Sequence, residues 1–366
     1  MSFLTRKIRI YIMCTLIAAF FIIAPLVLFY TAGFRYDFSR RKIIETGVLN
    51  IDALPTDSIV YLNNVKLNKK LPIYLPNRAQ GTYHIKITKI GYKTWEKDIT
   101  IESKKTTYIK NVILFKEALP IQILENYKKQ ITDMSPAPSG AYLLIISKED
   151  NGGGIYEIDL FNTTNKMLNP ILRAKLDEPP NVIWAPANDY ALIKTKINKT
   201  IHEQIIDTNN PETAPGYSFP KDANTIASTN KYEITRKEND LTVSRIEDSE
   251  VKENKTLSTP NIKYNQQTGE WLAWSSWELW TIYPDGNAVL LNRTSDKMNF
   301  VVPIDKYGLL LLASENKITG FNPGYYVTHE LFSNGKIESV GANITNRKIF
   351  FLGEVAGKRG VYELDY

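Results

Sequence analysis

The chain has 366 residues, of which 43% are apolar and 23% charged, and this composition indicates two or three folded units instead of a disordered chain. Its formal net charge of +6 is modest and its lysines are scattered, so a nucleic-acid partner is not expected. The single cysteine, Cys14, excludes an internal disulfide and a cysteine-based zinc site.

The first predicted element is a membrane-spanning helix. No charged residue occurs between Arg9 and Arg35, and the apolar stretch 10–34 is long enough for a helix to cross a bilayer core. A helix satisfies its own backbone hydrogen bonds and is therefore stable in lipid. We expect a cytoplasmic tail over residues 1–9 and an uncleaved transmembrane helix over residues 10–34.

Two other interpretations of this segment fit less well. A cleaved secretory signal needs a shorter apolar core and a small-x-small cleavage site, which Thr31-Ala32-Gly33 matches poorly. A lipoprotein needs its apolar segment before the cysteine, whereas here it follows Cys14. Basic residues are nearly balanced on the two sides of the helix, so they do not fix its orientation. The short tail favours a cytoplasmic N-terminus, with the remaining domains outside the cell.

After a basic linker, expected at residues 35–44, the hydrophobic periodicity changes from helical to alternating. Four β-branched or aromatic runs follow, at residues 48–51, 59–62, 83–87 and 107–112. Turn-forming residues such as Pro55-Thr56-Asp57 separate these runs. The pattern predicts a small β-sandwich over residues 45–116.

Short motifs within this segment match a known family in order and spacing. They are Gly47-Val48-Leu49-Asn50-Ile51, Pro55-Thr56-Asp57-Ser58 before Ile59-Val60-Tyr61-Leu62-Asn63, Leu71-Pro72, Gly81-Thr82-Tyr83-His84-Ile85 and Gly91-Tyr92. In these motifs the segment resembles the PEGA domain, a surface-associated β module of bacteria and archaea. Two departures fall in turns: Pro-Thr-Asp-Ser replaces the namesake tetrapeptide, and Asn68-Lys69-Lys70 lacks the usual glycine. The resemblance implies presentation and protein contact outside the cell, and no reaction.

The remaining chain, residues 120–366, contains a repeated β unit. Each unit is a turn of small and polar residues, then a short apolar strand, then a second strand. Six such turns begin at Ser135, Trp184, Ser228, Asn265, Asp305 and Thr345. Their spacing of about 38 to 49 residues is close to the period of a four-stranded propeller blade.

In this pattern the segment resembles the WD40-like propellers of the TolB type, and it predicts a β-propeller of about six blades. Three units continue into a strand that we expect to close a blade edge, at residues 154–160, 278–283 and 360–365. Radial closure would protect the edges of so many strands from aggregation. A pair of two-sheet sandwiches is the structural alternative.

No motif assigns a catalytic, cofactor-binding or metal-binding residue. The sequence contains no G-x-S-x-G, H-E-x-x-H or Walker pattern. Asn151-Gly152-Gly153-Gly154 precedes a strand and is typical of a hairpin loop, while Asp285-Gly286 lacks the further carboxylates of a calcium loop. His84, His202 and His329 have no histidine partner at a metal-ligand spacing, and we expect each on a strand or loop surface.

Four tryptophans stand three residues apart: Trp271, Trp274, Trp277 and Trp280. Ser275-Ser276 interrupts them and their flanks alternate, so we expect a hairpin in which two rings pack between blades and the others are exposed. Exposed aromatic rings can anchor a partner. Quinoprotein propellers repeat a Thr-Gly-Lys and Trp motif, which Thr268-Gly269-Glu270-Trp271 approaches only once, so no quinone cofactor is expected.

We therefore expect an all-β, non-catalytic protein held in the plasma membrane of a prokaryote by a single helix. Its extracytoplasmic domains would bind or scaffold a protein or glycan of the cell envelope through propeller loops, without a cofactor. Two alternatives stay open. One is an extracytoplasmic hydrolase with carboxylates such as Asp159 or Asp305 at the propeller channel, and the other is a purely structural stalk.

Overall fold

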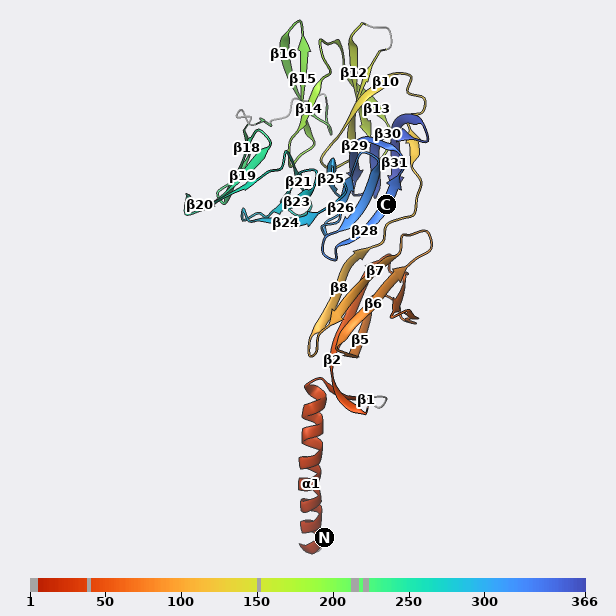
Figure 1. Ribbon diagram of the computed structural model, residues 1–366, viewed down its shortest axis with the longest axis vertical. Helices are drawn as coiled ribbons and strands as arrows, with labels where there is room; N and C mark the ends of the chain where they lie inside the picture. Colours follow the sequence, from red (N-terminus) through yellow and green to blue (C-terminus); the bar gives the residue numbers. More distant parts are fainter. Residues whose placement is uncertain (1–5, 38–40, 150–152, 212–216, 220–223) are drawn as a thin grey trace. The chain divides into compact units, whose positions relative to one another are not determined.

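The computed structural model describes residues 6–37, 41–149, 153–211, 217–219 and 224–366 (Figure 1). The chain divides into two compact units, residues 1–114 and 115–366. In the described residues, every helix or strand after the N-terminal helix α1 (Arg6–Thr31) is a β-strand. The prediction of an all-β protein with one N-terminal helix is confirmed.

Helix α1 has 26 residues, which corresponds to about 39 Å at 1.5 Å per residue. Within it, the 24-residue segment Ile8–Thr31 is apolar enough in average composition, and long enough, to cross a membrane. The helix ends at Thr31 and not at the expected residue 34. Gly33 has φ +83°, a left-handed conformation that commonly ends helices, and strand β1 (Phe34–Asp37) follows at once.

Two four-stranded sheets make up the small domain of the first unit. One sheet consists of β1, β2 (Lys42–Leu54), β5 (Ile73–Ala79) and β8 (Thr106–Ile113), with β8 parallel to β2. The other consists of β4 (Val65–Lys66), β3 (Ile59–Leu62), β6 (Gly81–Thr88) and β7 (Trp95–Ile101). Alternate side chains of both sheets are buried, among them Ile51 of the first sheet and Ile85 of the second. Burial from two sheets is the core pattern of a sandwich.

Within the segment 35–44, which we expected to be a linker, residues 35–37 and 42–44 belong instead to two paired antiparallel strands, β1 and the start of β2. Phe34 pairs with Glu45 and Asp37 pairs with Lys42 across β1 and β2. Thr46 also donates a 2.8 Å hydrogen bond from its hydroxyl to the carbonyl oxygen of Gly33. Strand β1 lies at the edge of its sheet, and both paired segments are rich in charged residues, so their sequence lacks the apolar alternation that indicates a strand.

The second unit contains six antiparallel sheets in chain order, here called blades 1 to 6 (Figure 1). Blade 1 consists of β10 (Gln130–Pro136), β11 (Tyr142–Lys148), β12 (Ile155–Asn162) and β13 (Leu168–Lys175). Blade 2 has three strands in the described residues, β14 (Asn181–Trp184), β15 (Tyr190–Ile197) and β16 (Thr200–Asp207). Blade 3 consists of β17 (Thr225–Ser228), β18 (Tyr232–Lys237), β19 (Asp240–Glu247) and β20 (Glu250–Leu257).

Blades 4 to 6 repeat this arrangement. Blade 4 consists of β21 (Asn261–Asn265), β22 (Glu270–Trp274), β23 (Glu278–Ile282) and β24 (Ala288–Arg293). Blade 5 consists of β25 (Phe300–Pro303), β26 (Leu310–Ala313), β27 (Lys317–Asn322) and β28 (Val327–Ser333). Blade 6 consists of β29 (Lys336–Asn343), β30 (Lys348–Val355), β31 (Lys358–Asp365) and, from the start of the unit, β9 (Ile121–Ile123).

Strand β9 closes the ring. It pairs antiparallel with β31, so that Ile123 lies opposite Val361 and Ile121 opposite Glu363. The first strand of the unit is therefore the outermost strand of the last blade. Closure of this kind removes the free ends that an open row of blades would have. The predicted propeller of about six blades is confirmed.

The six repeated turns in the sequence occupy the same place in every blade, between its first and second strands. The strands at 154–160, 278–283 and 360–365, however, are third strands (β12, β23 and β31) and do not close a blade edge. The true edges, such as β13 and β24, lie outside them. Edge strands are more polar than inner strands. The sequence pattern therefore did not reveal the fourth strand of each blade, and the third strand was taken for the edge.

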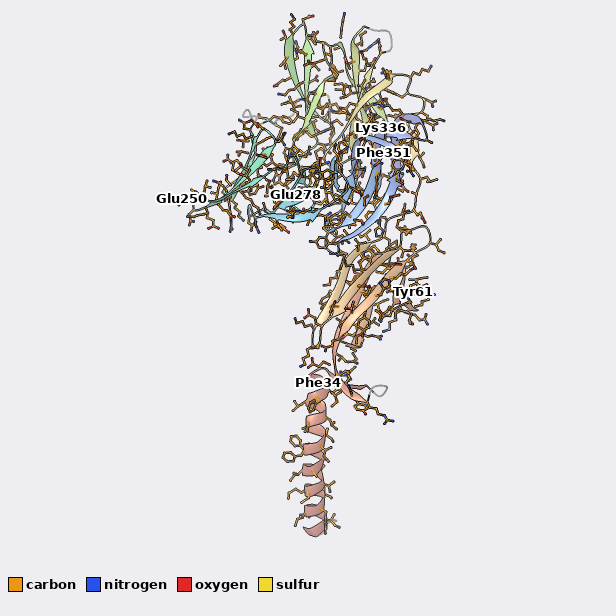
Figure 2. All side chains as sticks on the ribbon, in the orientation of Figure 1. Phe34, Tyr61, Glu250, Glu278, Lys336 and Phe351 are labelled. Atoms are coloured by element: carbon orange, nitrogen blue, oxygen red, sulfur yellow. The ribbon has the colours of Figure 1, made fainter. Side chains whose placement is uncertain are left out.

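Burial falls from the inside of a blade to its edge. In the second strands of every blade except blade 3, whose β18 alternates, consecutive side chains are buried, as in β26, where all four are buried. Both faces of these strands pack against neighbouring blades, and so their sequences are continuous apolar runs. In the outer strand β20, by contrast, five consecutive residues from Glu250 are exposed. Figure 2 shows Glu250 at the tip of its blade and Phe351 inside blade 6.

Candidate functional site

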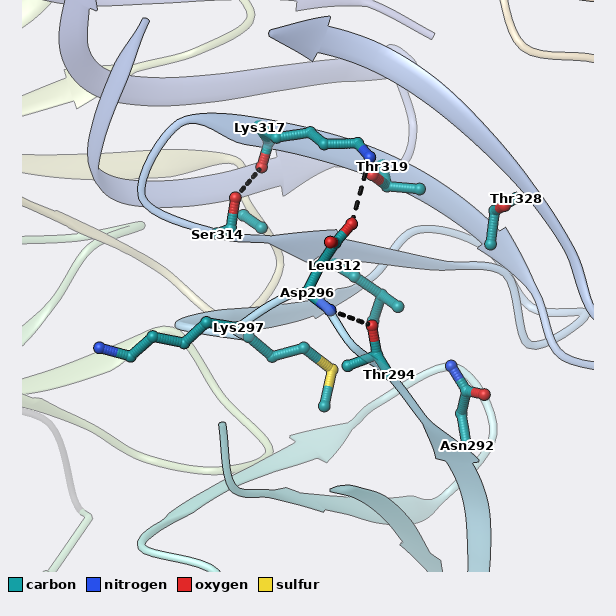
Figure 3. A pocket seen from close by; sticks show the side chains of 11 residues that line it. Asn292, Thr294, Asp296, Lys297, Leu312, Ser314, Lys317, Thr319 and Thr328 are labelled. Atoms are coloured by element: carbon teal, nitrogen blue, oxygen red, sulfur yellow. Dashed lines mark hydrogen bonds and ion pairs between the residues drawn. The ribbon is translucent and has the colours of Figure 1, made fainter. Parts of the chain in front are cut away.

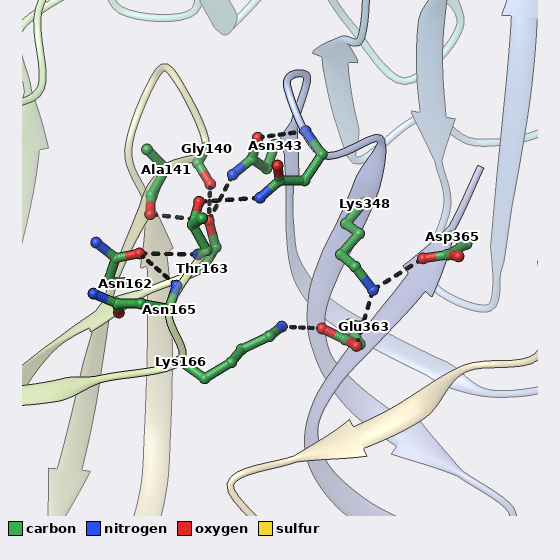
Figure 4. A network of polar contacts seen from close by, with 12 residues as sticks. Gly140, Ala141, Asn162, Thr163, Asn165, Lys166, Asn343, Lys348, Glu363 and Asp365 are labelled. Carbon is green, nitrogen blue, oxygen red and sulfur yellow. Dashed lines mark hydrogen bonds and ion pairs between the residues drawn. The ribbon is translucent and has the colours of Figure 1, made fainter.

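The face of the propeller that carries the turns between first and second strands is joined across blades by polar contacts (Figure 4). The hydroxyl of Thr163, in blade 1, lies 3.0 Å from the carbonyl oxygen of Gly140 and 2.9 Å from that of Ala141. The side-chain amide of Asn343, in blade 6, donates a 2.8 Å hydrogen bond to the same hydroxyl. These buried bonds fix blade 6 against blade 1.

Charged residues extend this junction toward the outside of the same blades (Figure 4). Lys166 of blade 1 forms an ion pair with Glu363 of blade 6. Lys348 lies 3.0 Å from both Glu363 and Asp365. Burial opposes ionisation of Glu363, but the hydrogen bonds from Lys166 and Lys348 keep its pKa below the usual value. Every carboxylate here has a lysine partner, so the cluster stabilises the ring and offers no free group to a ligand.

The ring encloses a central cavity of about 860 Å³. First strands of all six blades line it, from Ser135 of β10 through Ile183, Thr225, Ile262 and Phe300 to Val340 of β29. Cavities that hold small molecules in proteins have volumes of roughly 300–1,000 Å³. The cavity is therefore the candidate functional site of the second unit.

Aromatic rings make up much of the cavity wall. They are Trp184, Tyr217, Phe219, Tyr264, Trp271, Trp274 and Phe300. Tyr217 and Phe219 come from the connection between blades 2 and 3, where the ring of Tyr217 lies 5.4 Å from that of Tyr190 and 5.0 Å from that of Phe219. Such rings offer flat apolar surfaces on which a planar ligand can stack.

Cations line the cavity from blades 2, 3 and 4, and carboxylates line it from blades 1 and 6. Lys194 is held 2.7 Å from Glu203. The Arg236 Nε is buried without a hydrogen-bond partner. Lys263 has its pKa lowered to about 8 by burial, and no charged group of the described residues offsets this cost. Lys263 keeps part of its surface open to the cavity, but the crowded protein atoms around it leave its ammonium poorly solvated.

The carboxylates on the opposite side of the cavity are Glu338 and Asp133. Glu338 is bound by Arg359, with its Oε1 3.2 Å from the Arg359 Nε, and by Lys336 at 3.3 Å. The hydrogen bond from Arg359 lowers the pKa of Glu338. A general acid needs a raised pKa, so Glu338 is unsuited to that role.

Asp159 and Asp305, which the hydrolase alternative placed at the channel, do not line the cavity. Asp159 is buried inside blade 1, where it accepts a 2.6 Å hydrogen bond from the hydroxyl of Tyr127. Asp305 lies in the turn between β25 and β26 and accepts 2.8 Å hydrogen bonds from the backbone N–H groups of Tyr307 and Leu309. Burial raises the pKa of Asp305. Both carboxylates have structural roles in the places where they lie.

The three histidines, which we expected on strand or loop surfaces, lie in different environments. His202 is exposed on β16 and His84 lies on β6, 2.8 Å from a carboxylate oxygen of Asp98. His329 is half-buried, with its ring 5.6 Å from that of Phe115, so its expected surface position is wrong. In the described residues, no group of three or more His, Cys, Asp or Glu residues could hold a metal ion.

The tryptophans form the expected hairpin of β22 and β23. Trp271 and Trp274 are only 5% and 7% exposed, and they pack in the cores between blades 3 and 4 and between blades 4 and 5. Trp277 is 53% exposed, whereas Trp280 is half-buried against the core between blades 3 and 4 and is not one of the expected exposed rings. The prediction of two packed rings is confirmed. Sequence reasoning missed Lys263 and Arg236, although alignment of the six turns would have placed Lys263 on a first strand, two residues before its turn.

A second, smaller pocket of about 170 Å³ lies between blades 4 and 5 (Figure 3). Two of its charged groups satisfy one another, since the Lys317 Nζ lies 3.2 Å from a carboxylate oxygen of Asp296. The backbone N–H of Asp296 donates in turn to the hydroxyl of Thr294 over 3.1 Å. The pocket therefore has less room and fewer free charges than the central cavity.

Residues 46–114 match the PEGA domain family over strands β2 to β8. This segment is a PEGA domain. In the PEGA domain, Gly47 sits where a Cβ atom would lie 2.2 Å from the carbonyl oxygen of Glu102, so only glycine fits there. The Pro55-Thr56-Asp57-Ser58 turn of the PEGA domain is closed by a 2.6 Å hydrogen bond from the Ser58 hydroxyl to the carbonyl oxygen of Pro55. No curated protein sequence matches the chain.

Two solved structures are similar to the chain at low identity. Hsv2 of Kluyveromyces lactis, a β-propeller, is 12% identical, with 62% of this chain and 72% of Hsv2 covered at a TM-score of 0.35. A structural-genomics protein of unknown function from Bacteroides thetaiotaomicron is 11% identical, with coverages of 84% and 90% and a TM-score of 0.36. These likenesses are too weak to transfer a ligand or partner. The PEGA domain and the propeller together suggest a binding or scaffold role.

Proposed function

We propose that the protein is a non-catalytic membrane-anchored protein of a prokaryotic cell envelope. Helix α1 would hold it in the plasma membrane, with the PEGA domain and the propeller on the extracytoplasmic side. The propeller would bind a protein or glycan of the envelope through one of its two loop faces. Neither domain needs a cofactor for this role.

Three exposed tyrosines at one end of blades 4 and 5 carry the proposal. Tyr283, Tyr307 and Tyr326 are 37%, 46% and 64% exposed. Tyr283 directly follows β23, Tyr307 lies between β25 and β26, and Tyr326 lies between β27 and β28. In an antiparallel blade the first and third turns lie at the same end, so the three rings belong to one face. Exposed tyrosines are enriched where proteins bind partners.

Helix α1 supports the membrane anchor. Its span Ile8–Thr31 contains one charged residue, Arg9, near its start, and a helix of this length matches a bilayer core of about 30 Å. A PEGA domain directly after the helix favours an extracytoplasmic location for the rest of the chain. A purely structural stalk would need the anchor but not the exposed tyrosines.

The hydrolase alternative has less support in the site. Of the cavity carboxylates in the described residues, Glu338 is neutralised by Arg359 and Lys336, and Asp133 accepts a hydrogen bond from the backbone N–H of Met134 at 2.7 Å. A pair of carboxylates with pKa values pushed apart is the usual requirement for acid–base hydrolysis. The geometry favours binding.

Photo-crosslinking of the full-length protein in the cells that produce it tests the proposal. A benzophenone amino acid is placed in turn at Tyr283, Tyr307 and Tyr326, and as a control at Trp277, which lies on the opposite end of blade 4. We expect the three tyrosine positions to give the same adduct with one envelope component and Trp277 to give none of it. Adducts that are absent at all three positions, or equally strong at Trp277, would reject this face as the binding surface.

A further inference from the structure

The central cavity combines flat apolar walls with positive charge on one side. We propose that it binds a small organic anion with a planar apolar body, whose acidic group lies between blades 3 and 4 at Lys263 and Arg236. The proposal goes beyond the loop-face function and does not depend on it, because the cavity lies inside the ring and the tyrosines lie on its face.

The charge argument rests on two cations that have no counter-ion among the described residues. Arg236 contributes from blade 3 and Lys263 from blade 4, and neither forms an ion pair with another residue in the part of the chain that the structure describes. A buried charge without a partner is costly, and a bound carboxylate, sulfonate or phosphate would remove that cost. Lys194 already has Glu203 as its partner, so it adds less to such a site.

The distribution of charge orients the ligand. Glu338 and Asp133 lie on the first strands of blades 6 and 1, which neighbour each other across the ring from blades 3 and 4. Glu338 is already neutralised by Arg359 and Lys336, but Asp133 adds negative charge on that side, so an acidic group would be attracted instead to Arg236 and Lys263. The ligand would therefore bind with its anionic end toward blades 3 and 4.

The aromatic walls set the shape of the rest of the ligand. Tyr264 stands on blade 4 beside Lys263, backed by the buried Trp271 at a ring-centroid distance of 5.0 Å, and Tyr217 and Phe219 project from the preceding connection. Planar apolar groups stack on such rings, whereas sugars and flexible chains gain less from them. Size, charge and wall chemistry together specify an aryl anion or an anion of similar shape.

The test uses the full-length protein in lipid nanodiscs and two isosteric probes, 2-naphthoate and the neutral 2-naphthamide. Binding is measured by titration calorimetry, with empty nanodiscs subtracted. We expect saturable binding of 2-naphthoate at least about tenfold tighter than that of 2-naphthamide, since hydrogen bonds to charged groups are worth about that factor. Equal affinities for both probes, or no saturable binding of 2-naphthoate, would overturn the proposal.

Variants locate the site. Lys263→Gln and Arg236→Gln are each expected to weaken 2-naphthoate about tenfold and to leave 2-naphthamide unchanged. Lys263→Arg keeps the charge and should retain most of the binding. Lys175→Gln, an exposed lysine on the edge strand β13, is the matched control and should change nothing. Thermal unfolding of each variant verifies that it is folded, and full affinity in a folded Lys263→Gln protein would contradict the assignment.

Discussion

Trp271 donates a 3.0 Å hydrogen bond from its indole Nε1 to the hydroxyl of Tyr232, and this buried contact joins blade 4 to blade 3. The two rings belong to one apolar cluster that also contains Ile234 and Leu241. Removing one partner of a buried hydrogen bond leaves the other polar group without a partner in the apolar core, and this costs more free energy than the bond itself contributes. The pair thus fixes the relative position of the two blades that carry Arg236 and Lys263.

Tyr232→Phe is expected to destabilise the propeller by about 1–3 kcal/mol, because it leaves the indole N–H of Trp271 buried without an acceptor. Tyr264→Phe is the matched control, since its ring also lies 5.0 Å from Trp271 and it removes a hydroxyl that makes no hydrogen bond to a described residue. Denaturant unfolding followed by tryptophan fluorescence measures both. Equal effects of the two changes would mean that the hydrogen bond contributes little.

Gly140→Ala is expected to destabilise the junction of blades 1 and 6 by more than about 3 kcal/mol. A Cβ atom at Gly140 would lie 1.7 Å from the carbonyl oxygen of Ala342, and its φ is +69°. Gly357→Ala is the control, because its φ is +79° but nothing lies within 4 Å of a Cβ there. The control should cost only the left-handed strain of about 1–2 kcal/mol. Thermal unfolding separates the two, and similar losses would show that the junction can adjust.

Acid is expected to weaken the same junction through Glu363. Its pKa is held below 4.5 in the folded protein, so the unfolded chain binds a proton first. The stability from this carboxylate is therefore present above about pH 4.5 and is lost as the pH falls through its folded pKa. Glu363→Gln should lower the stability at pH 7 and make it less dependent on pH between 5 and 3. A variant with the same pH dependence as the original protein would rule out this contribution.

Raising the pH above neutrality is expected to increase the stability of the propeller through Lys263. Its pKa falls from 10.5 in an unfolded chain to about 8 in the folded protein, so between these values the unfolded chain binds more protons and stability rises with pH. The other charged or titratable groups that line the cavity are Lys194, Arg236, Asp133, Glu338 and the phenols of Tyr217 and Tyr264. Unfolding free energies of the original protein and of Lys263→Gln, compared from pH 7 to 10.5, isolate the contribution of this lysine.

Lys263→Gln should be more stable than the original protein at pH 7, and the difference should shrink as the pH approaches 10.5. Binding of 2-naphthoate should weaken above about pH 8 in the original protein only. A constant difference in stability across this range would show that Lys263 keeps its ordinary pKa.

Cys14 distinguishes a membrane anchor from a cleaved signal sequence. It is the only cysteine and lies on α1, exposed toward what would be lipid. As an anchor, it should resist a charged maleimide in intact membranes and react fully after denaturation in detergent, because thiolates do not form in lipid. Cleavage after the helix would remove Cys14, and mature protein would then stay unlabelled even when denatured.

The sequence by itself determined the features that depend on residues close together in the chain. A stretch of apolar residues without charge predicted the helix, and the resemblance of residues 45–116 to the PEGA domain predicted the sandwich. The six turns were recognisable because their residues bond their own backbone, as Asp305 does to Tyr307 and Asn265 does to Gln267 over 3.0 Å. Such bonds span only a few residues, so they act wherever the segment lies in the fold.

Contacts between distant segments were decided only by the tertiary structure. Strand β9 closes blade 6 through pairs such as Ile123 with Val361, and Asn343 bonds Thr163 across 180 residues of sequence. The role of Lys263 has the same origin. Its ammonium loses solvent because other segments of the folded chain pack around it, and no window of sequence around Lys263 contains the atoms that exclude the water.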